Sequence, residues 1–198
     1  MDAKLYLIVG GTTPRATIDA AVAGGVDLVQ LRDKRLDDDA FLARAQELAR
    51  HLDVPLVLND RWHLFEESGA DGVHVGQDDA PIEQVRRALG PGALLGLSTH
   101  DRAEALAARA RGADYIGLGP MYPTETKALT YEPRGAALVR EAIDATDLPV
   151  FPIGGIDAER LPALVEAGAR RACVSRAILG ADDPQAAAEA LRRALTRF

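Results

Sequence analysis

The sequence lacks a second cysteine and any excess of positive charge. Its one cysteine, Cys173, has no partner for an intrachain disulfide, so we expect a buried, inert thiol and a reducing compartment. Lysine and arginine number 23 against 30 aspartate and glutamate residues, which gives a formal net charge of -7. We therefore predict no nucleic-acid partner, because binding to phosphate backbones needs clustered basic residues in excess. Any anionic ligand must be bound by local cations.

Long apolar runs are also absent from the sequence. None approaches membrane-spanning length, and the chain begins with Met1-Asp2-Ala3-Lys4 instead of the charged region and apolar core of a signal peptide. We therefore expect a cytoplasmic protein without a membrane partner. The 198 residues are 47% hydrophobic and 27% charged, which is typical of a globular chain and predicts one domain over residues 1–198.

Eight short runs rich in valine, isoleucine and leucine predict strands that are buried on both faces. They span residues 5–9, 27–31, 55–59, 72–75, 94–97, 114–118, 149–153 and 171–175. Segments with helical spacing alternate with them, at residues 39–52, 81–89, 101–111, 135–145, 157–167 and 184–195. Asp101, Asp157 and Asp183 are expected to cap the helices that follow them.

One short phrase recurs before four of the predicted strands and indicates repeated βα units. It is written Ala-Gly-Gly-Val-Asp, Ser-Gly-Ala-Asp-Gly, Arg-Gly-Ala-Asp-Tyr and Ala-Gly-Ala-Arg-Arg, with the glycine ending a helix. A doubly wound open sheet shares this alternation, but the turn at residues 10–14 lacks the GxGxxG spacing expected after its first strand. We therefore predict an α/β fold, a single-domain (β/α)8 TIM barrel, with a functional or mobile loop at residues 119–134.

Polar residues at the ends of the apolar runs are the candidates for a site, because such a barrel forms its site at the carboxyl ends of its strands. At the second to fourth runs these residues are Gln30, Arg32, Asp33, Lys34, Asn59, Asp60 and Asp79. Cations beside carboxylates suggest a polyphosphate that is bound partly by arginine and lysine and partly through Mg2+.

The later runs supply a second group of candidates. Ser98 and His100 follow the fifth run, Thr124, Thr126 and Lys127 lie on the loop after the sixth, and Gly154-Gly155 and Ser175-Arg176 follow the last two. Hydroxyls and a point cation suit phosphate oxygens. Backbone N–H groups after the last two strands of a barrel suit a monophosphate.

Each candidate also has a structural interpretation that stays open. The charged residues 32–35 are typical of a solvated helix start, although their place directly after an apolar run favours the site. Asp79 and the pair Asn59-Asp60 are equally suited to starting helices. Gly154-Gly155 suits a tight turn and Arg176 a surface ion pair. His74 is expected to line the barrel, and His100 to act either as a base or as a helix cap.

In order and spacing, several of these segments resemble thiamine phosphate synthases almost from end to end. The segments are Gln30-Leu31-Arg32-Asp33-Lys34, Val57-Leu58-Asn59-Asp60, His74-Val75-Gly76-Gln77-Asp78-Asp79, Gly96-Leu97-Ser98, Gly117-Leu118-Gly119-Pro120 and Pro123-Thr124-Glu125-Thr126-Lys127. The resemblance implies a TIM-barrel transferase of thiamine biosynthesis. It couples hydroxymethylpyrimidine diphosphate with a thiazole phosphate, releases diphosphate and uses Mg2+.

The family pattern also implies a role for each matching residue. It implies that the pyrimidine diphosphate is bound by Gln30, Leu31, Arg32, Asp33, Lys34, Asn59, Ser98 and Lys127. Among these, Arg32, Lys34, Ser98 and Lys127 are expected to be catalytic. Asp60 and Asp79 fall on the magnesium positions. It implies that the thiazole phosphate is bound by Thr124, Glu125, Thr126, Gly155, Ser175 and Arg176. The chain departs from the pattern at Arg176, where some relatives carry serine, and at Val9-Gly10, where many carry aspartate.

Two other functions compete with this interpretation. A related thiazole tautomerase shares the first motif, the Ser-x-His segment and the Gly-Gly-Ile turn, and its base would be His100. That branch lacks the full diphosphate and metal set, whereas Asn59, Asp60 and Asp79 are all present here. A non-catalytic phosphate-binding barrel is the second competitor. A homo-oligomer is compatible with all three.

Overall fold

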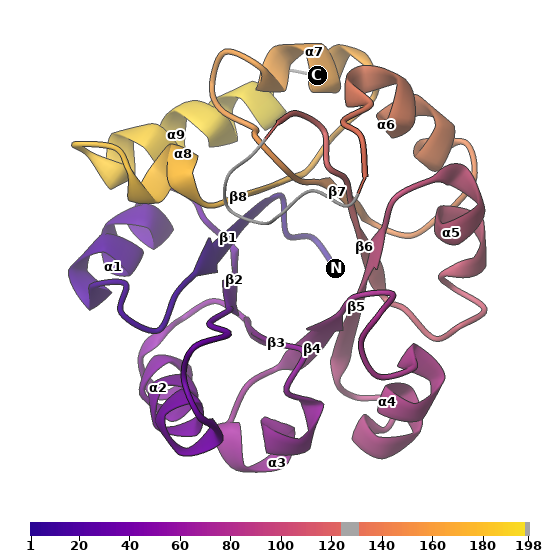
Figure 1. Ribbon diagram of the computed structural model, residues 1–198. Coiled ribbons are helices and arrows are strands. Elements are labelled where there is room, and N and C mark those ends of the chain that lie inside the picture. The colour runs from indigo at the N-terminus through magenta and orange to yellow at the C-terminus, as the bar shows by residue number, and fades with distance from the viewer. Residues whose placement is uncertain (124–130, 197–198) are drawn as a thin grey trace.

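The computed structural model describes residues 1–123 and 131–196, and within them eight parallel strands form one sheet in the order β7-β6-β5-β4-β3-β2-β1-β8. The strands are β1 (Leu5–Val9), β2 (Leu28–Leu31), β3 (Leu56–Asn59), β4 (Gly72–Val75), β5 (Leu94–Thr99), β6 (Tyr115–Leu118), β7 (Val150–Pro152) and β8 (Ala172–Val174). A parallel bridge between Ile153 and Cys173 joins the last two strands and closes the sheet into a barrel (Figure 1). The predicted TIM-barrel class is confirmed.

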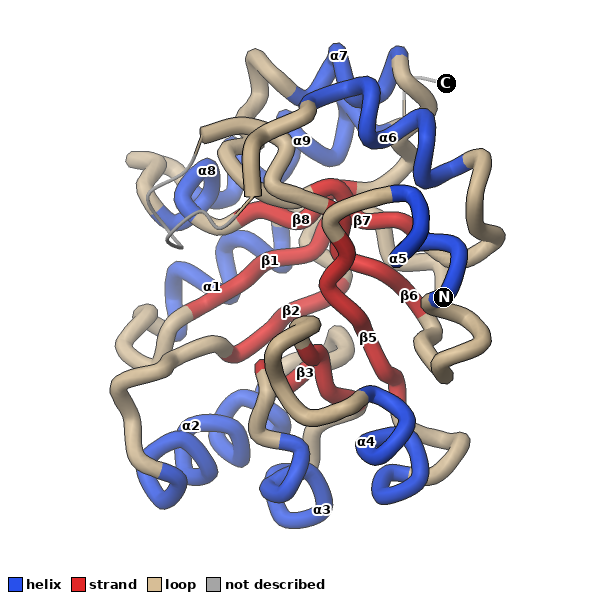
Figure 2. The backbone as a smooth tube through the Cα atoms, turned by 45° about the vertical axis from the view of Figure 1, so that its right-hand side comes forward, coloured by secondary structure: helices blue, strands red, loops and turns tan. Residues whose placement is uncertain are grey.

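Helices surround the strands on the outside, as Figure 2 shows. They are α1 (Arg15–Ala23), α2 (Asp38–His51), α3 (Phe65–Ser68), α4 (Ile82–Leu89), α5 (Arg102–Ala107), α6 (Gly135–Ile143), α7 (Leu161–Glu166), α8 (Arg176–Leu179) and α9 (Pro184–Leu195), with a short 3-10 helix, η1 (Trp62–Leu64). None of the helices in the described residues is long and apolar enough to cross a membrane.

Each strand is buried on two faces because its side chains point alternately to the helices and into the barrel. In β1, Leu5 and Leu7 belong to the apolar layer under the helices, whereas Tyr6 points into the barrel. The inner cluster consists of Tyr6, Leu28, Val57, Tyr115, Phe151 and Cys173. Cys173 is 2% exposed and free, which confirms the expected buried thiol.

The aspartate of the repeated phrase has a structural role that the sequence did not reveal. Asp27 accepts a hydrogen bond from the backbone N–H of Leu5 at 2.8 Å, and Asp71 accepts one from Leu56 at 2.8 Å. Asp114 does the same for β5. Each carboxylate therefore satisfies a backbone donor where the strand before its own begins, at the end of the barrel opposite the predicted site.

Three sequence predictions need correction. Helix α7 begins at Leu161 instead of Asp157, because the Asp157 carboxylate accepts hydrogen bonds from Glu159 and Arg160 in a turn ahead of the helix. Strand β5 extends to Thr99, so Ser98 lies within the strand instead of after it. Helices α1, α3 and α8 and the 3-10 helix η1 were not predicted. The caps at Asp101 and Asp183 are confirmed.

Candidate active site

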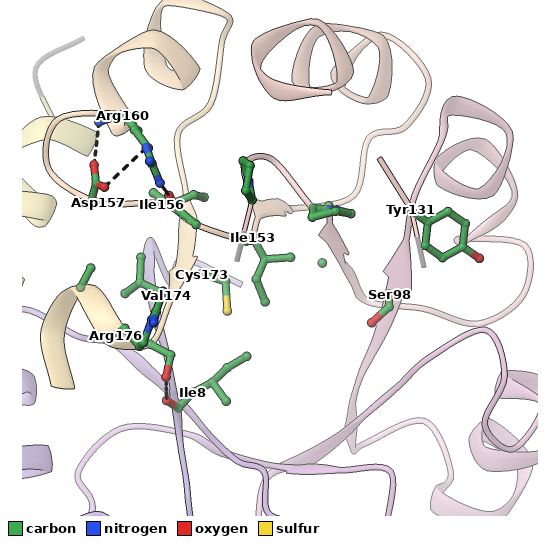
Figure 3. A pocket seen from close by; sticks show the side chains of 18 of the residues that line it. Ile8, Ser98, Tyr131, Ile153, Ile156, Asp157, Arg160, Cys173, Val174 and Arg176 are labelled. Atoms are coloured by element: carbon green, nitrogen blue, oxygen red, sulfur yellow. Dashed lines mark hydrogen bonds and ion pairs between the residues drawn. The ribbon is translucent and has the colours of Figure 1, made fainter. Parts of the chain in front are cut away.

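A cavity of about 400 Å³ lies among the carboxyl ends of β5, β6, β7 and β8. Seven of the candidate residues line it: Arg32, Ser98, His100, Gly154, Gly155, Ser175 and Arg176. In Figure 3, Arg176 lies on one side of the cavity and Ser98 on the other. The strand-tip rule therefore found the correct end of the barrel.

The predicted residues of β2 have different surroundings. Gln30 points into the barrel and donates a hydrogen bond to the hydroxyl of Tyr6, whereas Leu31 is fully buried under the helices. The buried Asp33 accepts hydrogen bonds from the backbone N–H groups of Arg35 at 2.9 Å and Gly11 at 3.2 Å, and the first of these is the main cause of its lowered pKa. A substrate contact by Leu31 or Asp33 stays a prediction, because these side chains serve the core and the loop.

Asp60 follows β3 in the left-handed backbone region, with a φ of 63°. Few residues other than glycine adopt this conformation, although aspartate and asparagine tolerate it best. The Asn59 amide donates a hydrogen bond to the Asp60 carboxylate at 2.6 Å. This turn presents a carboxylate at the strand end, and backbone strain of this kind often marks a functional position.

Two carboxyls and a lysine converge at the ends of β2, β3 and β4. The Nζ atom of Lys34 lies 3.6 Å from Oδ2 of Asp60. Burial, followed by the hydrogen bond and charge of Asp79, raises the pKa of Asp60 to about 6, against the smaller opposing effects of Lys34 and Asn59. Lys34, Asp60 and Asp79 therefore lie close together at these strand tips. A ligand shared by the three side chains stays a prediction.

Lys34, Asp60 and Asp79 are not among the residues that line the cavity, whereas the turns after β7 and β8 contribute Gly155 and Ser175 to it. Gly155 has a φ of 61°, and a Cβ there would lie 2.5 Å from the carbonyl oxygen of Pro123, so only glycine fits. The Ser175 hydroxyl donates to the carbonyl oxygen of Ile8 at 2.9 Å. Arg176, on the same turn as Ser175, lines the cavity with an exposed side chain.

The loop after β6 contributes from both of its described ends. The predicted residues Thr124, Glu125, Thr126 and Lys127 lie outside the described residues. Tyr131 lines the cavity and stacks on His100 with ring centroids 3.7 Å apart. The backbone N–H of His100 donates to the Glu104 carboxylate at 2.7 Å, and Nδ1 of its ring lies 3.0 Å from the same oxygen. His100 thus contacts a helix start and also lines the cavity.

Sequence reasoning missed several residues of the site. Tyr131, Asp157 and Arg160 line the cavity, and Tyr6 and Tyr115 form hydrogen bonds inside the barrel below it. The sequence offered a signal for the two tyrosines, because each places a polar hydroxyl at an inward position of an otherwise apolar strand. The prediction that His74 lines the barrel is confirmed, since it is 7% exposed and faces Tyr115.

Comparisons with known proteins agree with this geometry. A family model described as thiamine monophosphate synthase matches residues 5–178. The thiamine-phosphate synthase of Mycobacterium sp. (strain KMS) is 46% identical over 210 residues, which cover 98% of this chain and 92% of that protein. A bifunctional thiamine biosynthesis protein of Symbiobacterium thermophilum is 46% identical over 191 residues, and the chain spans 40% of its length.

A solved structure shows the same likeness. The thiamine phosphate pyrophosphorylase from Pyrococcus furiosus superimposes with a TM-score of 0.84 at 29% sequence identity. The match covers 98% of this chain and 95% of that one. Fold and sequence therefore point in the same direction over nearly the full length.

Proposed function

Because the chain belongs to the thiamine monophosphate synthase family, we propose that it joins hydroxymethylpyrimidine diphosphate to a thiazole phosphate and releases diphosphate. The activity is that of a thiamine-phosphate synthase, a transferase that acts on small molecules. The observation that carries the assignment of residues is the meeting of Lys34, Asp60 and Asp79 at neighbouring strand ends. A cation and two carboxylates in one place suit a diphosphate that arrives with a metal ion.

We further propose that Asp60 and Asp79 hold Mg2+. Their carboxyls share one site, where burial, followed by the hydrogen bond and charge of Asp79, raises the pKa of Asp60. The described residues contain no group of three or more histidine, cysteine, aspartate and glutamate side chains placed to hold a metal. Mg2+ is commonly bound by one or two carboxylates together with substrate phosphates, so two aspartates fit this ion. When bound, it would neutralise charge on the diphosphate.

Two basic side chains that follow β2 would stabilise the leaving group. The carbon–oxygen bond between the pyrimidine methylene and the diphosphate breaks, and the diphosphate departs with the electron pair. Lys34, which lies beside Asp60, and Arg32, which lines the cavity, supply positive charge where this negative charge develops. Lys127 is proposed to add a third cation from the loop after β6.

The turns after β7 and β8 would position the second substrate. Its phosphate is proposed to lie against the backbone of Gly155 and Ser175 and the side chain of Arg176, with Thr124, Glu125 and Thr126 completing the pocket. This placement leaves the thiazole nitrogen facing the pyrimidine methylene, where the new carbon–nitrogen bond forms. The protein contributes position and electrostatics, so the dissociative substitution needs no covalent nucleophile.

A condensation assay with an Asp79→Asn variant tests this proposal. We expect Mg2+-dependent formation of thiamine phosphate in the unaltered chain and a loss of about a hundredfold or more in kcat/KM in the variant, because one of two metal-binding carboxylates is gone. Asp53→Asn is the matched control, since Asp53 is exposed and precedes the amino end of β3, whereas Asp60 follows its carboxyl end. Equal Mg2+-dependent turnover in both variants would refute the metal assignment. Tautomerisation of a thiazole carboxylate without condensation would refute the function.

The cellular compartment and the oligomeric state of the protein are further proposals. We propose a cytoplasmic enzyme because its single cysteine is a buried free thiol. A homo-oligomer stays a prediction.

A further inference from the structure

A continuous chain of hydrogen bonds crosses the barrel interior beneath the cavity. The Gln30 amide donates to the hydroxyl of Tyr6, which lies 3.0 Å from the hydroxyl of Tyr115. The Tyr115 hydroxyl lies 3.2 Å from Nδ1 of His74, and Nε2 of His74 lies 2.9 Å from Oγ of Ser98. The chain therefore joins β2 to β5 through three residues that the reaction itself does not require.

One end of the hydrogen-bond chain lies at the cavity, and the other lies two residues before a residue that lines it. Ser98 lines the cavity, and Gln30 lies on the same face of its strand as Arg32, which also lines it. Among the described residues, Oε1 of Gln30 has no hydrogen-bond partner. It is not one of the fully buried polar atoms that lack a partner, so it keeps some access to solvent. This oxygen therefore keeps the capacity to accept one more hydrogen bond.

The middle of the chain is sealed and fixed. Tyr6 and Tyr115 are 1% and 0% exposed, and burial raises the pKa of both hydroxyls, so they stay protonated. A Cβ at Gly96 would lie 2.2 Å from the Tyr115 ring and 2.3 Å from Nδ1 of His74. Glycine at this position thus leaves the room in which the two rings meet.

In a hydrogen-bond chain of this kind, the donor-to-acceptor direction of one bond fixes the direction of the others. Each tyrosine hydroxyl donates one proton and accepts one, and an imidazole does the same in its neutral form. Because the Gln30 amide nitrogen donates to Tyr6, the hydroxyl proton of Tyr6 is directed to Tyr115, and that of Tyr115 to Nδ1 of His74. Nε2 of His74 then donates to Ser98, whose own proton remains for the cavity. Reversing the amide would reverse every bond, so the two ends always have opposite polarity.

We propose that the chain Tyr6–Tyr115–His74 sets the hydrogen-bond polarity of the pyrimidine subsite, with Gln30 accepting and Ser98 donating, and thereby selects an amino over an oxo pyrimidine. The inference rests on the proposed function for the identity of the ring. An aminopyrimidine edge offers an N–H donor beside an unprotonated ring nitrogen. In the oxo analogue the edge is reversed, with a carbonyl acceptor beside a ring N–H. Tyr6, Tyr115 and His74 are positioning residues that act through the two ends.

The proposal is tested by the binding preference of Tyr115→Phe. The dissociation constants of 4-amino-2-methyl-5-hydroxymethylpyrimidine diphosphate and of its 4-oxo analogue are measured by calorimetry with Mg2+, for the unaltered chain and the variant. We expect the preference for the amino compound to fall about tenfold or more, since the loss of one hydrogen bond to a ligand lowers the affinity by roughly a factor of ten. The affinity for inorganic diphosphate should stay the same.

Phe151→Leu is the matched control. Phe151 packs edge-on against Tyr6 and Tyr115, with ring centroids 5.4 and 5.6 Å away, and none of the hydrogen bonds of the chain involves it. This variant should lower Tm and keep the preference. A preference that stays at the starting value in Tyr115→Phe, or one that falls equally in Phe151→Leu, overturns the proposal.

Tyr6→Phe and the double variant give a second, independent measurement. Both single changes interrupt one chain, so their effects on the preference should not multiply in the double variant. Multiplying effects would mean that the two hydroxyls act separately, which contradicts the proposal. Binding is measured without turnover, so the two proposals can fail separately. A protein that prefers the amino compound but forms no thiamine phosphate would refute the proposed function and leave the proposed hydrogen-bond polarity of the subsite intact.

Discussion

Asp60 shows at the scale of one residue how the candidate site lowers the stability of the fold. Its side chain is 24% exposed, and its pKa of about 6 lies above the ordinary value of 3.8, so the folded state binds a proton more tightly than the unfolded state does. The resulting stabilisation is present below about pH 4 and is lost as the pH rises through about 6. A shift of about two pKa units corresponds to at most about 3 kcal/mol.

We predict that Asp60→Asn stabilises the protein while it removes activity. Asparagine keeps the shape of the side chain, tolerates the left-handed backbone and carries no charge. In metal-free buffer at pH 8, urea unfolding should give a free energy of unfolding about 1–2 kcal/mol higher than that of the unaltered chain. At pH 4 the difference should vanish. A variant that is less stable at pH 8 would contradict the cause assigned to the raised pKa.

Single residues also show the limit of prediction from the sequence. The pattern of polar residues at strand ends found Arg32, Ser98 and Ser175 at the cavity. It did not reveal that the Ser175 hydroxyl is already used by a backbone carbonyl, nor that the Asp33 carboxylate holds a loop. Such partners come from segments distant in the sequence, and no local pattern encodes them.

At the scale of the helices and strands, the predictions succeeded where burial repeats along the chain. All eight strands were found, because residues packed on both faces form continuous apolar runs. Helix α1 was missed because it begins after Pro14 without a side-chain cap. Helices α3 and α8 are one turn long, too short for periodic spacing to be visible.

The repeated aspartates yield a prediction about stability. Asp71→Asn replaces the acceptor for the backbone N–H of Leu56 with a neutral amide, and we expect a loss of about 1–2 kcal/mol in the free energy of unfolding at pH 7. Urea unfolding measures it, with Asp53→Asn as the control that should change little. Condensation activity should be unchanged in folded Asp71→Asn, because stability residues lie at the end of the barrel opposite the site. Lost activity with unchanged stability would contradict this division.

The whole molecule divides its tasks between the two ends of one barrel. The carboxylates of Asp27, Asp71 and Asp114 satisfy backbone donors at the amino ends of the strands. Charged and strained residues gather at the carboxyl ends, with Asp60 and Gly155 both in the left-handed region. The fold class was predictable from the sequence because it follows from periodicity. The hydrogen bonds inside the barrel were not, because they depend on contacts among five strands.

A crystal structure with pyrimidine diphosphate and Mn2+ tests most directly the claim that the tips of β2, β3 and β4 hold a metal-bound diphosphate. Mn2+ takes oxygen ligands as Mg2+ does and is located by its anomalous scattering. We predict a peak bound by the carboxylates of Asp60 and Asp79, with Arg32 and Lys34 in contact with the diphosphate. A diphosphate bound elsewhere, with no metal between the two aspartates, would contradict the claim.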